Sequence, residues 1–576
     1  MRIARASCKQ TRQYTAQFYR HNKVSFALAV VSTTLIGGMN LLLAWLMQQM
    51  IDTISQVPGA YTLRQLIGFT AGCILLILCF KTISYFSLPR FMEKAMGQYK
   101  SFVLEKLVKK SISSFHQEST SAYLSALSND ALRIETDYLG KRFTLIQNTV
   151  LFFGAIVMML IYSPLLTLIA VAFFCLPILA ALATGSRVEQ AESLISHKNA
   201  GFISILKDCL SGFPVIKSFR AEDAIVKLLR DSNDSVESAK CRRRKLTTIL
   251  GTLGGIAGVT AQFGTFLAGG YLVLSGAHIT AGVLMIFIDL TANVINPLRE
   301  LPELLACRKA ALGLVDKLAS QLETHLREEG ADVPCVLREG ISLEQVSFAY
   351  EGGESVLRDI DVKFEAGKCY AIVGSSGSGK STLLNLLMAA HDNYSGMIRY
   401  DGAELRSISS GSLYDLVSIV QQNVFIFNAT IRENITMFQN FPQQEVDSVI
   451  QLAGLSELID NRGEDFLCGE SGCNLSGGEK QRISIARSLL RKSPVLLVDE
   501  ATSALDAKTA CQVSESILRL KSLTRIVVTH ALDEQLLQQY DCILVLHGGQ
   551  IEEMGTFNQL MGTGGYFHSL YTVSHE

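Results

Sequence analysis

The first 300 residues contain six long apolar segments, and no other feature restricts the possible folds as strongly. A hydrocarbon core about 30 Å thick needs about 20 apolar residues of helix to cross it. Each segment reaches this length, so the sequence predicts six membrane-spanning helices, with a tight YSP turn between the third and fourth. Their approximate bounds are 24–47, 65–88, 143–163, 165–185, 247–274 and 280–300.

The overall composition agrees with a membrane protein. Of the 576 residues, 48% are hydrophobic and 18% are charged, and the mean hydropathy is +0.27, which is too apolar for a water-soluble protein. The net charge of −1 gives no reason to expect a nucleic acid partner. The thirteen cysteines stand singly, without a C-x-x-C pair, which favours reduced thiols over disulfides or a metal site.

Charge asymmetry predicts the orientation of the spans. Residues 1–23 are basic and contain no acid, and the apolar segment that follows exceeds the length of about 7–15 residues typical of a cleavable signal peptide. The connections 89–142 and 186–246 are long and basic, including CRRRK at 241–245, whereas 275–279 has no Lys or Arg. Because basic connections stay in the cytoplasm, we expect the N-terminus, both long connections and the C-terminal half on that side.

Both long cytoplasmic connections contain a helical pattern. Residues 121–135 and 203–223 have apolar residues at helical spacing. Two interpretations fit this spacing equally well. The segments are either parts of long helices that leave the bilayer, or simple surface helices.

Polar residues recur on one face of the sixth span. Asp289, Asn293 and Asn296 are separated by four and three residues, and Asp289 lies about 15 Å from the outer end of the span, close to mid-bilayer. A carboxylate at that depth is costly and should face a partner or a water-filled cavity. The three residues are therefore a candidate face for substrate or ions. The alternative is a polar contact between helices, or a protonated acid.

A glycine-rich loop at 374–382 stands between a predicted buried strand and a predicted helix. Its G-x-x-x-x-G-K-[ST] pattern lets backbone N–H groups surround phosphate oxygens at a helix N-terminus. Lys380 would neutralise the β- and γ-phosphates and Ser381 would ligate Mg²⁺, so ATP and Mg²⁺ are the expected ligands. The candidate ATP-binding residues are Gly374, Ser375, Ser376, Gly377, Ser378, Gly379, Lys380, Ser381 and Thr382.

A second apolar strand, VLLVDE at 495–500, ends on two acids. Open α/β sheets bind ligands at the carboxyl ends of their strands. Asp499 is a candidate Mg²⁺ ligand, and Glu500 is the candidate general base for the water that attacks the γ-phosphate. Together with the glycine-rich loop, these acids predict ATP hydrolysis.

These motifs make the chain resemble a half-transporter of the ATP-binding cassette (ABC) superfamily with the exporter-type fold, over nearly its whole length. LSGGE at 475–479 matches the family signature, with Glu479 where many members have Gln. The resemblance implies that 121–135 and 203–223 are intracellular loops with coupling helices. It also implies an α-helical transmembrane domain and an α/β P-loop ATPase domain with a helical subdomain. The expected divisions are a cytoplasmic segment 1–23, a transmembrane domain 24–300, a linker 301–338 and a nucleotide-binding domain 339–576.

The same resemblance assigns roles around the nucleotide. It implies that Tyr350 stacks on adenine and that His530 is the switch histidine. Gln422 is implied as the Q-loop residue that senses Mg²⁺ and the γ-phosphate, because it has the family's spacing to Phe427; the adjacent Gln421 is the competing choice.

The resemblance also implies a dimer. The chain has one P-loop and one signature, without an internal repeat, and in this family the signature contacts the γ-phosphate held by a facing domain. We therefore expect a second half-transporter as partner, either identical or similar. Asp506 is implied as the D-loop residue and Glu470 as part of the loop that touches the membrane domain. The signature residues are Leu475, Ser476, Gly477, Gly478 and Glu479.

The leading functional hypothesis is ATP-driven export of a small molecule, peptide or lipid by a multi-pass protein in the lipid bilayer of a bacterial inner (plasma) membrane. The first alternative is import of a metal–siderophore, because the resemblance includes exporter-fold proteins that work inward. The second alternative is an ATP-gated channel or regulator that does not pump. The presence of Glu500 argues against this last alternative.

Overall fold

The computed structural model describes residues 10–116, 120–275, 279–323, 330–350, 352–500 and 507–575, and only the backbone for 116, 121, 174–189, 192–193, 196, 250, 323 and 507–509. The chain divides into two compact units. The first comprises Met1–Lys106 and Thr120–Gln321, and the second comprises Leu107–Ser119 and Leu322–Glu576. The first unit is helical, whereas the second contains all strands of the described residues.

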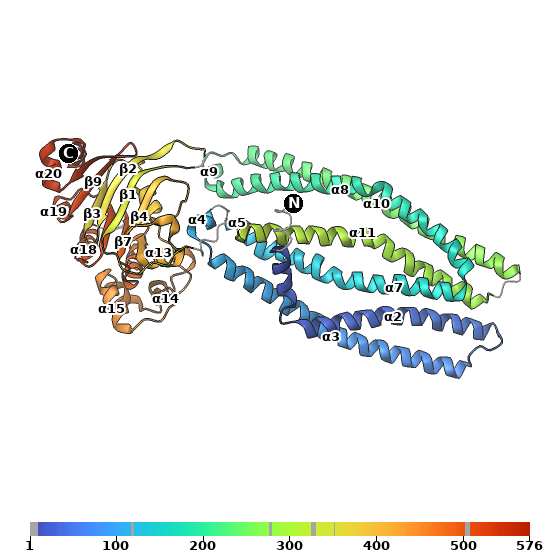
Figure 1. Cartoon of the computed structure of the whole chain (residues 1–576). Coiled ribbons are helices and arrows are strands. Elements are labelled where there is room, and N and C mark those ends of the chain that lie inside the picture. The colour runs from blue at the N-terminus through green and yellow to red at the C-terminus, as the bar shows by residue number, and fades with distance from the viewer. Residues whose placement is uncertain are drawn as a thin grey trace. The chain divides into compact units, whose positions relative to one another are not determined.

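Long helices build the first unit and run side by side along its length (Figure 1). They are α2 (Lys23–Ile54), α3 (Leu63–Val108), α7 (Lys141–Tyr162), α8 (Pro164–Ser211), α10 (Glu222–Leu274) and α11 (Ala281–Glu323). Shorter elements are η1 (Gln17–Tyr19), α5 (Thr120–Ser125), α6 (Ala131–Arg133), α9 (Phe213–Ser218) and the π-helical turns η2 (Ala126–Asp130) and η3 (Ile134–Gly140).

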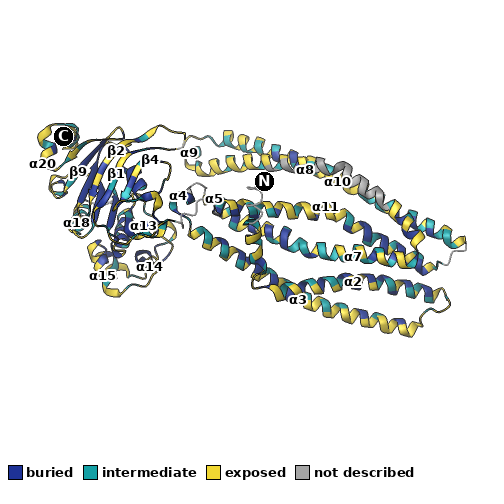
Figure 2. Cartoon of the chain, viewed as in Figure 1, coloured by how far each residue is buried: buried dark blue, intermediate teal, exposed yellow. Residues whose placement is uncertain are grey.

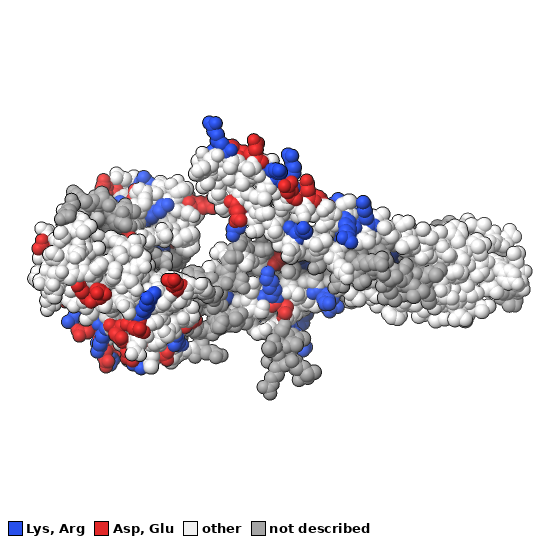
Figure 3. Space-filling model, turned by 90° about the horizontal axis from the view of Figure 1, so that it is seen from above, with Lys and Arg blue, Asp and Glu red and all other residues white. Residues whose placement is uncertain are grey.

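Five helical stretches of the described residues are long and apolar enough to cross a membrane. They are Lys23–Ile54, Leu63–Val108, Ala122–Tyr162, Glu222–Leu274 and Ala281–Leu322. The fourth predicted span, 165–185, falls in α8, whose apolar part with described side chains, Pro164–Phe173, is shorter. On the face seen in Figure 3, one end of this helical unit carries almost no charged side chains. This is the composition of a multi-span membrane protein.

The turn predicted at 162–164 separates α7 from α8. Ser163 is extended, and its Oγ accepts a hydrogen bond from the N–H of Leu166 at 3.3 Å. Pro164 occupies the first helical position, where its missing N–H has no helical acceptor in any case. The short sequence YSP therefore ends one helix and starts the next.

Residues 10–22 form an N-terminal strap on the first unit. Phe18 is fully buried, and its ring centroid lies 5.0 Å from that of Tyr99 in α3 and 5.8 Å from that of Tyr138 in η3. Tyr14 is also fully buried. The strap thus contributes aromatic side chains to the core rather than lying free on the surface.

Replacing Phe18 with Ala should lower the free energy of unfolding by about 3–5 kcal/mol, because it removes a buried ring and leaves a cavity. Thermal unfolding of the detergent-solubilised protein would show this as a lower Tm. Phe18→Leu, which keeps most of the volume, should lose much less. A Phe18→Ala protein with the wild-type Tm would contradict the packing role of the strap.

The second unit contains two sheets. A six-stranded sheet has the order β10-β9-β3-β8-β7-β6, parallel except for β10, and an antiparallel sheet has the order β2-β1-β4-β5. The strands are β1 (Gly340–Ala349), β2 (Ser355–Glu365), β3 (Cys369–Val373), β4 (Ser395–Tyr400), β5 (Ala403–Glu404), β6 (Val417–Val420), β7 (Val495–Asp499), β8 (Thr524–Val528), β9 (Cys542–His547) and β10 (Gln550–Gly555).

Helices complete this unit. They are α4 (Ile112–His116), α12 (Lys380–Leu387), η5 (Leu405–Ser407), α13 (Ser410–Leu416), α14 (Ile431–Thr436), α15 (Gln443–Leu452), α16 (Ser456–Arg462), η6 (Glu470–Gly472), α17 (Gly477–Leu490), α18 (Ala507–Leu518), α19 (Glu534–Leu537), α20 (Phe557–Thr563) and α21 (Tyr566–His575).

The parallel strands are buried on both faces, as Figure 2 shows by their dark blue colour. Successive side chains of β3 point to opposite faces. Tyr370 and Ile372 therefore join the core shared with the antiparallel sheet, whereas Ala371 and Val373 join the core shared with α14–α18. Two apolar cores hold the central strand, which fixes the position of the loop that follows it.

The short helix α4 belongs to the second unit although it follows α3 in the chain. The N–H of Ile112 donates to Tyr414 Oη at 3.1 Å, and Ser113 Oγ donates to Asp392 Oδ2 at 3.0 Å. Ile112 also packs against the core below the antiparallel sheet. A segment from the loop after the second predicted span is therefore bonded to the strand-containing unit.

The coupling role that the resemblance implies for residues 121–135 stays a prediction. Residues 121–135, which the resemblance suggested, lie in α5, η2, α6 and η3 of the first unit, where Ala126, Ala131 and Ile134 are buried. Their apolar spacing serves packing along the extension of α7. A helix of five residues such as α4 is too short to show a period, so periodicity could not locate it.

The other inner segment, 203–223, joins α8 to α10 through α9. The 53 residues of α10 are about 80 Å long, far more than a bilayer core requires. The inner segments are therefore parts of long helices that leave the bilayer, and the interpretation as simple surface helices is wrong.

Candidate functional site

The glycine-rich loop connects β3 to α12 and needs glycine at both ends. Gly379 has a left-handed φ of 101°, and a Cβ on it would lie 2.7 Å from Leu357 Cδ2. A Cβ on Gly374 would lie 2.2 Å from the carbonyl oxygen of Leu546. The loop can therefore close tightly around an anion only with these residues.

Lys380 lies inside this loop with 5% of its surface exposed. Its Nζ donates to the carbonyl oxygens of Gly374 at 3.0 Å and Ser375 at 2.9 Å. Burial lowers the pKa of Lys380, and the nearby acids Glu500 and Asp499 oppose that shift. The ammonium group has carbonyls as its hydrogen-bond partners, so an anion held in the loop would compensate its charge.

Ser378 provides a further indication of an anion site. Its Oγ is buried and has no hydrogen-bond partner among the described residues. Buried hydroxyl groups are normally paired. A hydroxyl without a partner in the glycine-rich loop fits a bound phosphate, whose oxygen would accept the hydrogen bond that Ser378 Oγ lacks.

Ser381 and Asp499 face each other across the loop. Ser381 Oγ donates to Asp499 Oδ1 at 3.0 Å. Burial raises the pKa of Asp499, the hydrogen bond from Ser381 opposes that shift, and the neighbouring Glu500 adds to it. A hydroxyl and a carboxylate oxygen side by side are hard ligands of the kind that Mg²⁺ prefers.

Glu500 follows β7 directly and is bonded at both carboxylate oxygens. Gln422 Nε2 donates to Oε2 at 2.6 Å, and His530 Nε2 lies 2.8 Å from Oε1. The backbone of Glu500 is left-handed, with φ of 48°, a conformation that non-glycine residues rarely adopt without functional constraint. Of the two neighbouring glutamines, Gln422 is the one whose amide bonds this acid.

Tyr350 stands beside α12. Its Oη lies 3.1 Å from Thr382 Oγ1, and its ring centroid lies 5.0 Å from Phe348 and 5.4 Å from His391, both in edge-on geometry. The Tyr350 side chain is 45% exposed, which leaves part of the ring open to solvent. His391 is a neighbour of this tyrosine that no sequence pattern indicated.

The signature turn is built separately from the loop. Ser476 caps α17: its Oγ accepts from the N–H of Glu479 at 3.3 Å, and Glu479 Oε2 accepts from the N–H of Ser476 at 2.6 Å. Glu479 therefore works as a capping-box partner, which explains how a carboxylate fits there. Ser476 and Gly477 are exposed, whereas Leu475 is a core residue. Among the described residues, Ser476 and Glu479 make no hydrogen bond to the glycine-rich loop.

The remaining candidates lie elsewhere. Glu470 is exposed in η6, and Asp506 lies outside the described residues. In the first unit Asp289 and Asn296 are exposed on α11, and Asn293 Nδ2 donates to Asp289 Oδ2 at 3.3 Å. These three polar residues share one face, as their spacing predicts.

Two residues near the site were missed by the sequence reasoning. Asn434 is fully buried, and the half-buried Arg487 donates to the backbone carbonyls of Asn434 and of Phe425, three residues after Gln422. Neither has a motif of its own. The capping box of Thr430 and Glu433, a T-x-x-E pattern, was the one local signal that could have located α14.

Comparisons with known proteins agree with this geometry. The model of the ABC transporter transmembrane region matches residues 26–298, and the ABC transporter model matches 357–503. An uncharacterised ABC transporter ATP-binding protein of Sinorhizobium fredii is 28% identical over 578 residues, covering 97% of this chain and 96% of the relative. An ATP-dependent lipid A-core flippase of Syntrophus aciditrophicus is 29% identical, covering 96% and 92% respectively.

The fold also has a solved counterpart. The structure of a bacterial Atm1-family ABC exporter with ATP bound superposes with a TM-score of 0.82 at 23% identity, covering 97% of this chain and 99% of that one. One membrane region and one nucleotide-binding ATPase domain thus stand on a single chain in the exporter arrangement. The chain belongs to the ABC transporters, as an ATP-hydrolysing half-transporter.

Proposed function

We propose that two half-transporters of this kind pair and use ATP to export a lipid or an amphipathic small molecule. Half-transporters of this family generally dimerise. One observation carries the proposal: within one ATPase domain, Lys380 and Glu500 converge at the glycine-rich loop, whereas Ser476 is exposed and bonded only within its own helix cap. An exposed turn of N–H groups at a helix N-terminus suits a phosphate presented by another chain.

The nucleotide roles follow from the contacts. Lys380 and Ser378 would hold phosphate oxygens, and Tyr350 would stack on the base. Glu500 would accept a proton from the attacking water, with Gln422 and His530 orienting its two oxygens. The orientation by two donors keeps the carboxylate in place before the reaction.

The donors also fit Mg²⁺. Ser381 and Asp499 supply two oxygen ligands, and Gln422 is the proposed third. Two or three protein oxygens suffice for Mg²⁺, because this ion keeps waters and phosphate oxygens in its shell. When bound, Mg²⁺ would neutralise charge on the phosphates.

The direction and the cargo rest on the relatives and on the spans. Several relatives are named lipid A-core flippases, and the structural counterpart is named an exporter. The basic connections support our proposal that the ATPase domain lies in the cytoplasm, at a bacterial inner membrane, with residues 203–223 and Glu470 as coupling elements. The partner chain is proposed to be a copy or a close relative of this one.

Transport direction can be measured in inside-out vesicles that contain the protein. ATP-dependent accumulation of a fluorescent phospholipid or amphipathic dye supports export, with Glu500→Gln vesicles as the control. ATP-dependent depletion would instead support the import alternative. ATP hydrolysis without any movement of these cargoes, but with an ATP-dependent ion conductance, would support the channel alternative.

Asp289 tests the proposed cargo face. Asp289→Asn should lower ATP-driven transport several-fold, because the carboxylate is exposed on α11 and its bonded partner is the amide of Asn293. Transport in vesicles and the Tm of the purified protein should be measured together. A lower Tm with unchanged transport would assign Asp289 to a polar contact between helices.

A further inference from the structure

Asn434, near the end of α14, holds the segment 422–430 by its side chain. It is 0% exposed, and its amide bonds both backbone groups of Phe427: Oδ1 accepts from the N–H at 2.9 Å and Nδ2 donates to the carbonyl at 3.0 Å, which also accepts from the N–H of Ala429 at 2.8 Å. Nδ2 also donates to the carbonyl of Thr430 at 3.0 Å. The amide thus replaces the partners that a neighbouring strand would supply, and the segment has little freedom to shift around Phe427.

Arg487 of α17 connects the same segment to a second helix. Its Nε donates to the carbonyl of Asn434 at 2.9 Å, Nη1 to the carbonyl of Phe425 at 3.2 Å, and Nη2 to Asn434 Oδ1 at 3.3 Å. Burial lowers the pKa of Arg487. All three guanidinium nitrogens therefore have acceptors on the segment and on α14.

The segment is attached at its other end to the reaction centre. Gln422 precedes Phe425 by three residues and donates to Glu500 at 2.6 Å. The helix that carries Arg487 begins at the signature, because Ser476 is its N-cap. Arg487 follows Ser476 by eleven residues, which is about 16 Å along the helix axis. One rigid helix thus carries the signature turn at one end and the guanidinium at the other.

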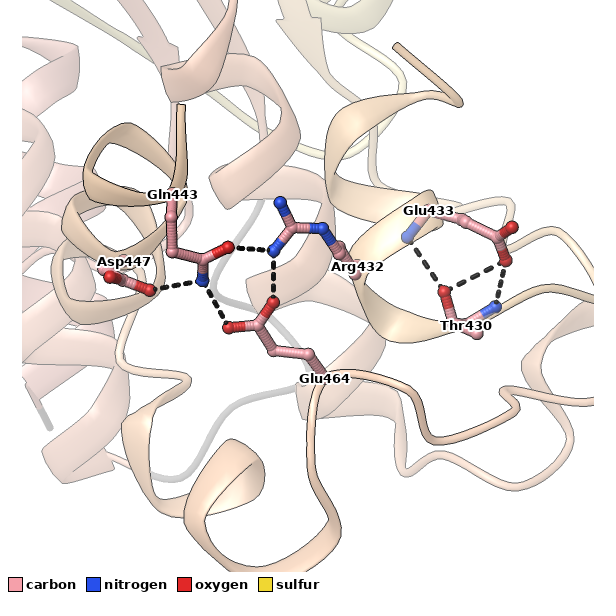
Figure 4. A network of polar contacts seen from close by, with 6 residues as sticks. All are labelled: Thr430, Arg432, Glu433, Gln443, Asp447 and Glu464. Atoms are coloured by element: carbon pink, nitrogen blue, oxygen red, sulfur yellow. Dashed lines mark hydrogen bonds and ion pairs between the residues drawn. The ribbon is translucent and has the colours of Figure 1, made fainter. Parts of the chain in front are cut away.

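The outer side of α14 is held independently, as Figure 4 shows. Arg432 donates to Glu464 Oε2 at 2.6 Å, and Gln443 Nε2 donates to Glu464 Oε1 and to Asp447 Oδ1, each at 2.9 Å. Thr430 and the glutamate three residues later form a capping box, which caps the N-terminus of α14. These contacts hold α14 in place on its outer side. A shift of the segment 422–430 is therefore transmitted to Arg487 and α17 and is not taken up by a movement of α14.

We propose that Arg487 is a positioning residue that couples Gln422 at one ATP to Ser476, the turn offered to the ATP of the partner. This inference rests on the proposed roles of Gln422 and Ser476. When bound nucleotide moves Gln422, the segment 422–430 moves with it, and its hydrogen bonds to the Arg487 guanidinium reorient α17. The signature turn at the start of α17 contacts the ATP of the partner, so each ATP site changes the position of the signature at the other site. The result is positive cooperativity between the two ATP sites.

Arginine suits this task because its planar guanidinium presents several donors in a fixed arrangement. Lysine would keep the charge but offers a single nitrogen, which cannot reach the carbonyl of Phe425 and both acceptors of Asn434 in the same geometry. Arg487→Lys is therefore the informative variant, because it changes the connection while keeping the charge.

The test is a double-mutant cycle with the full-length protein in lipid, combining Arg487→Lys and Gln422→Ala. Arg487→Lys should lower kcat for ATP hydrolysis about tenfold with little change in KM, and the Hill coefficient for ATP should fall from about 2 toward 1. In the Gln422→Ala background the same substitution should cause almost no further loss. Arg491→Lys, at an exposed arginine that pairs with Asp415 at 3.2 Å just after α17, is the matched control and should keep the wild-type rate and Hill coefficient.

The outcomes separate this coupling from the function proposed above. If Gln422→Ala hydrolyses ATP at the wild-type rate, the role of Gln422 is wrong and the coupling is overturned with it. If Gln422→Ala is slow and Arg487→Lys slows it by a further tenfold, only the coupling is overturned.

A second variant tests the coupling in case Arg487→Lys destabilises the folded protein. Should Arg487→Lys lower the Tm of the nucleotide-free protein, Asn434→Asp provides the same cycle, since it keeps the acceptor for Arg487 and removes the donors to Phe427 and Thr430. It should likewise be non-additive with Gln422→Ala, and additivity would overturn the coupling.

Discussion

Replacing Glu500 with Gln is expected to lower kcat for ATP hydrolysis by about 10²–10⁴-fold, the range of a general base. The amide is isosteric and can still bond Gln422 and His530, but it cannot accept the proton of the attacking water. ATP binding should persist, because Lys380 and the glycine-rich loop are unchanged. Phosphate release gives the rate, and the Tm increase caused by ATP reports binding.

The matched control is Glu445→Gln, the same chemical change at an exposed acid of α15 that pairs with Lys492 at 2.7 Å. It should leave the hydrolysis rate unchanged. Hydrolysis by Glu500→Gln at more than about one tenth of the wild-type rate would be incompatible with a general base, whose removal costs at least about 10²-fold.

Replacing Lys380 with Met is expected to abolish the stabilisation of the protein by ATP. With ATP at 100 times its Kd, this stabilisation amounts to about 2.7 kcal/mol in the wild type. Burial lowers the pKa of Lys380, which means that the charged form of this lysine is less stable in the folded protein than in the unfolded chain. Removing that charge should therefore leave the Tm of the nucleotide-free protein unchanged or raised.

Thermal unfolding with and without ATP separates the two effects, and Lys492→Met on the surface is the control that should keep the full ATP-induced shift. A Lys380→Met protein that unfolds early without nucleotide would mean that the lysine supports the loop itself. An unchanged ATP-induced shift would mean that the lysine does not contact the phosphates.

The glycine-rich loop was predictable because its chemistry is local. Gly374 and Gly379 are required by backbone geometry within a few residues, and the spacing to Lys380 and Ser381 follows from the strand, the turn and the helix start. Glu500 was predictable for a similar reason, since it directly follows a buried strand. Such features depend on chain positions next to one another, and periodicity or motif spacing detects them.

The connections between distant positions could not be predicted in this way. Nothing in the sequence around Asn434 indicates that its amide is buried, and Ser113 lies 279 residues away from Asp392, to which it donates. The helical pattern of 121–135 did not show which partner its apolar face has, and the structure places Ala126, Ala131 and Ile134 in the core of the first unit.

The amino-acid sequence alone determined the apolar spans, the phosphate loop, the two acids and hence ATP-driven work at a membrane, because each depends on residue type and local spacing. Only the tertiary structure decided that both oxygens of Glu500 are bonded, that Glu479 caps its helix, and that Arg487 connects two helices. These contacts depend on which buried groups meet when the sheet and helices pack, and a buried donor takes the nearest acceptor in space, however far away it lies in the chain.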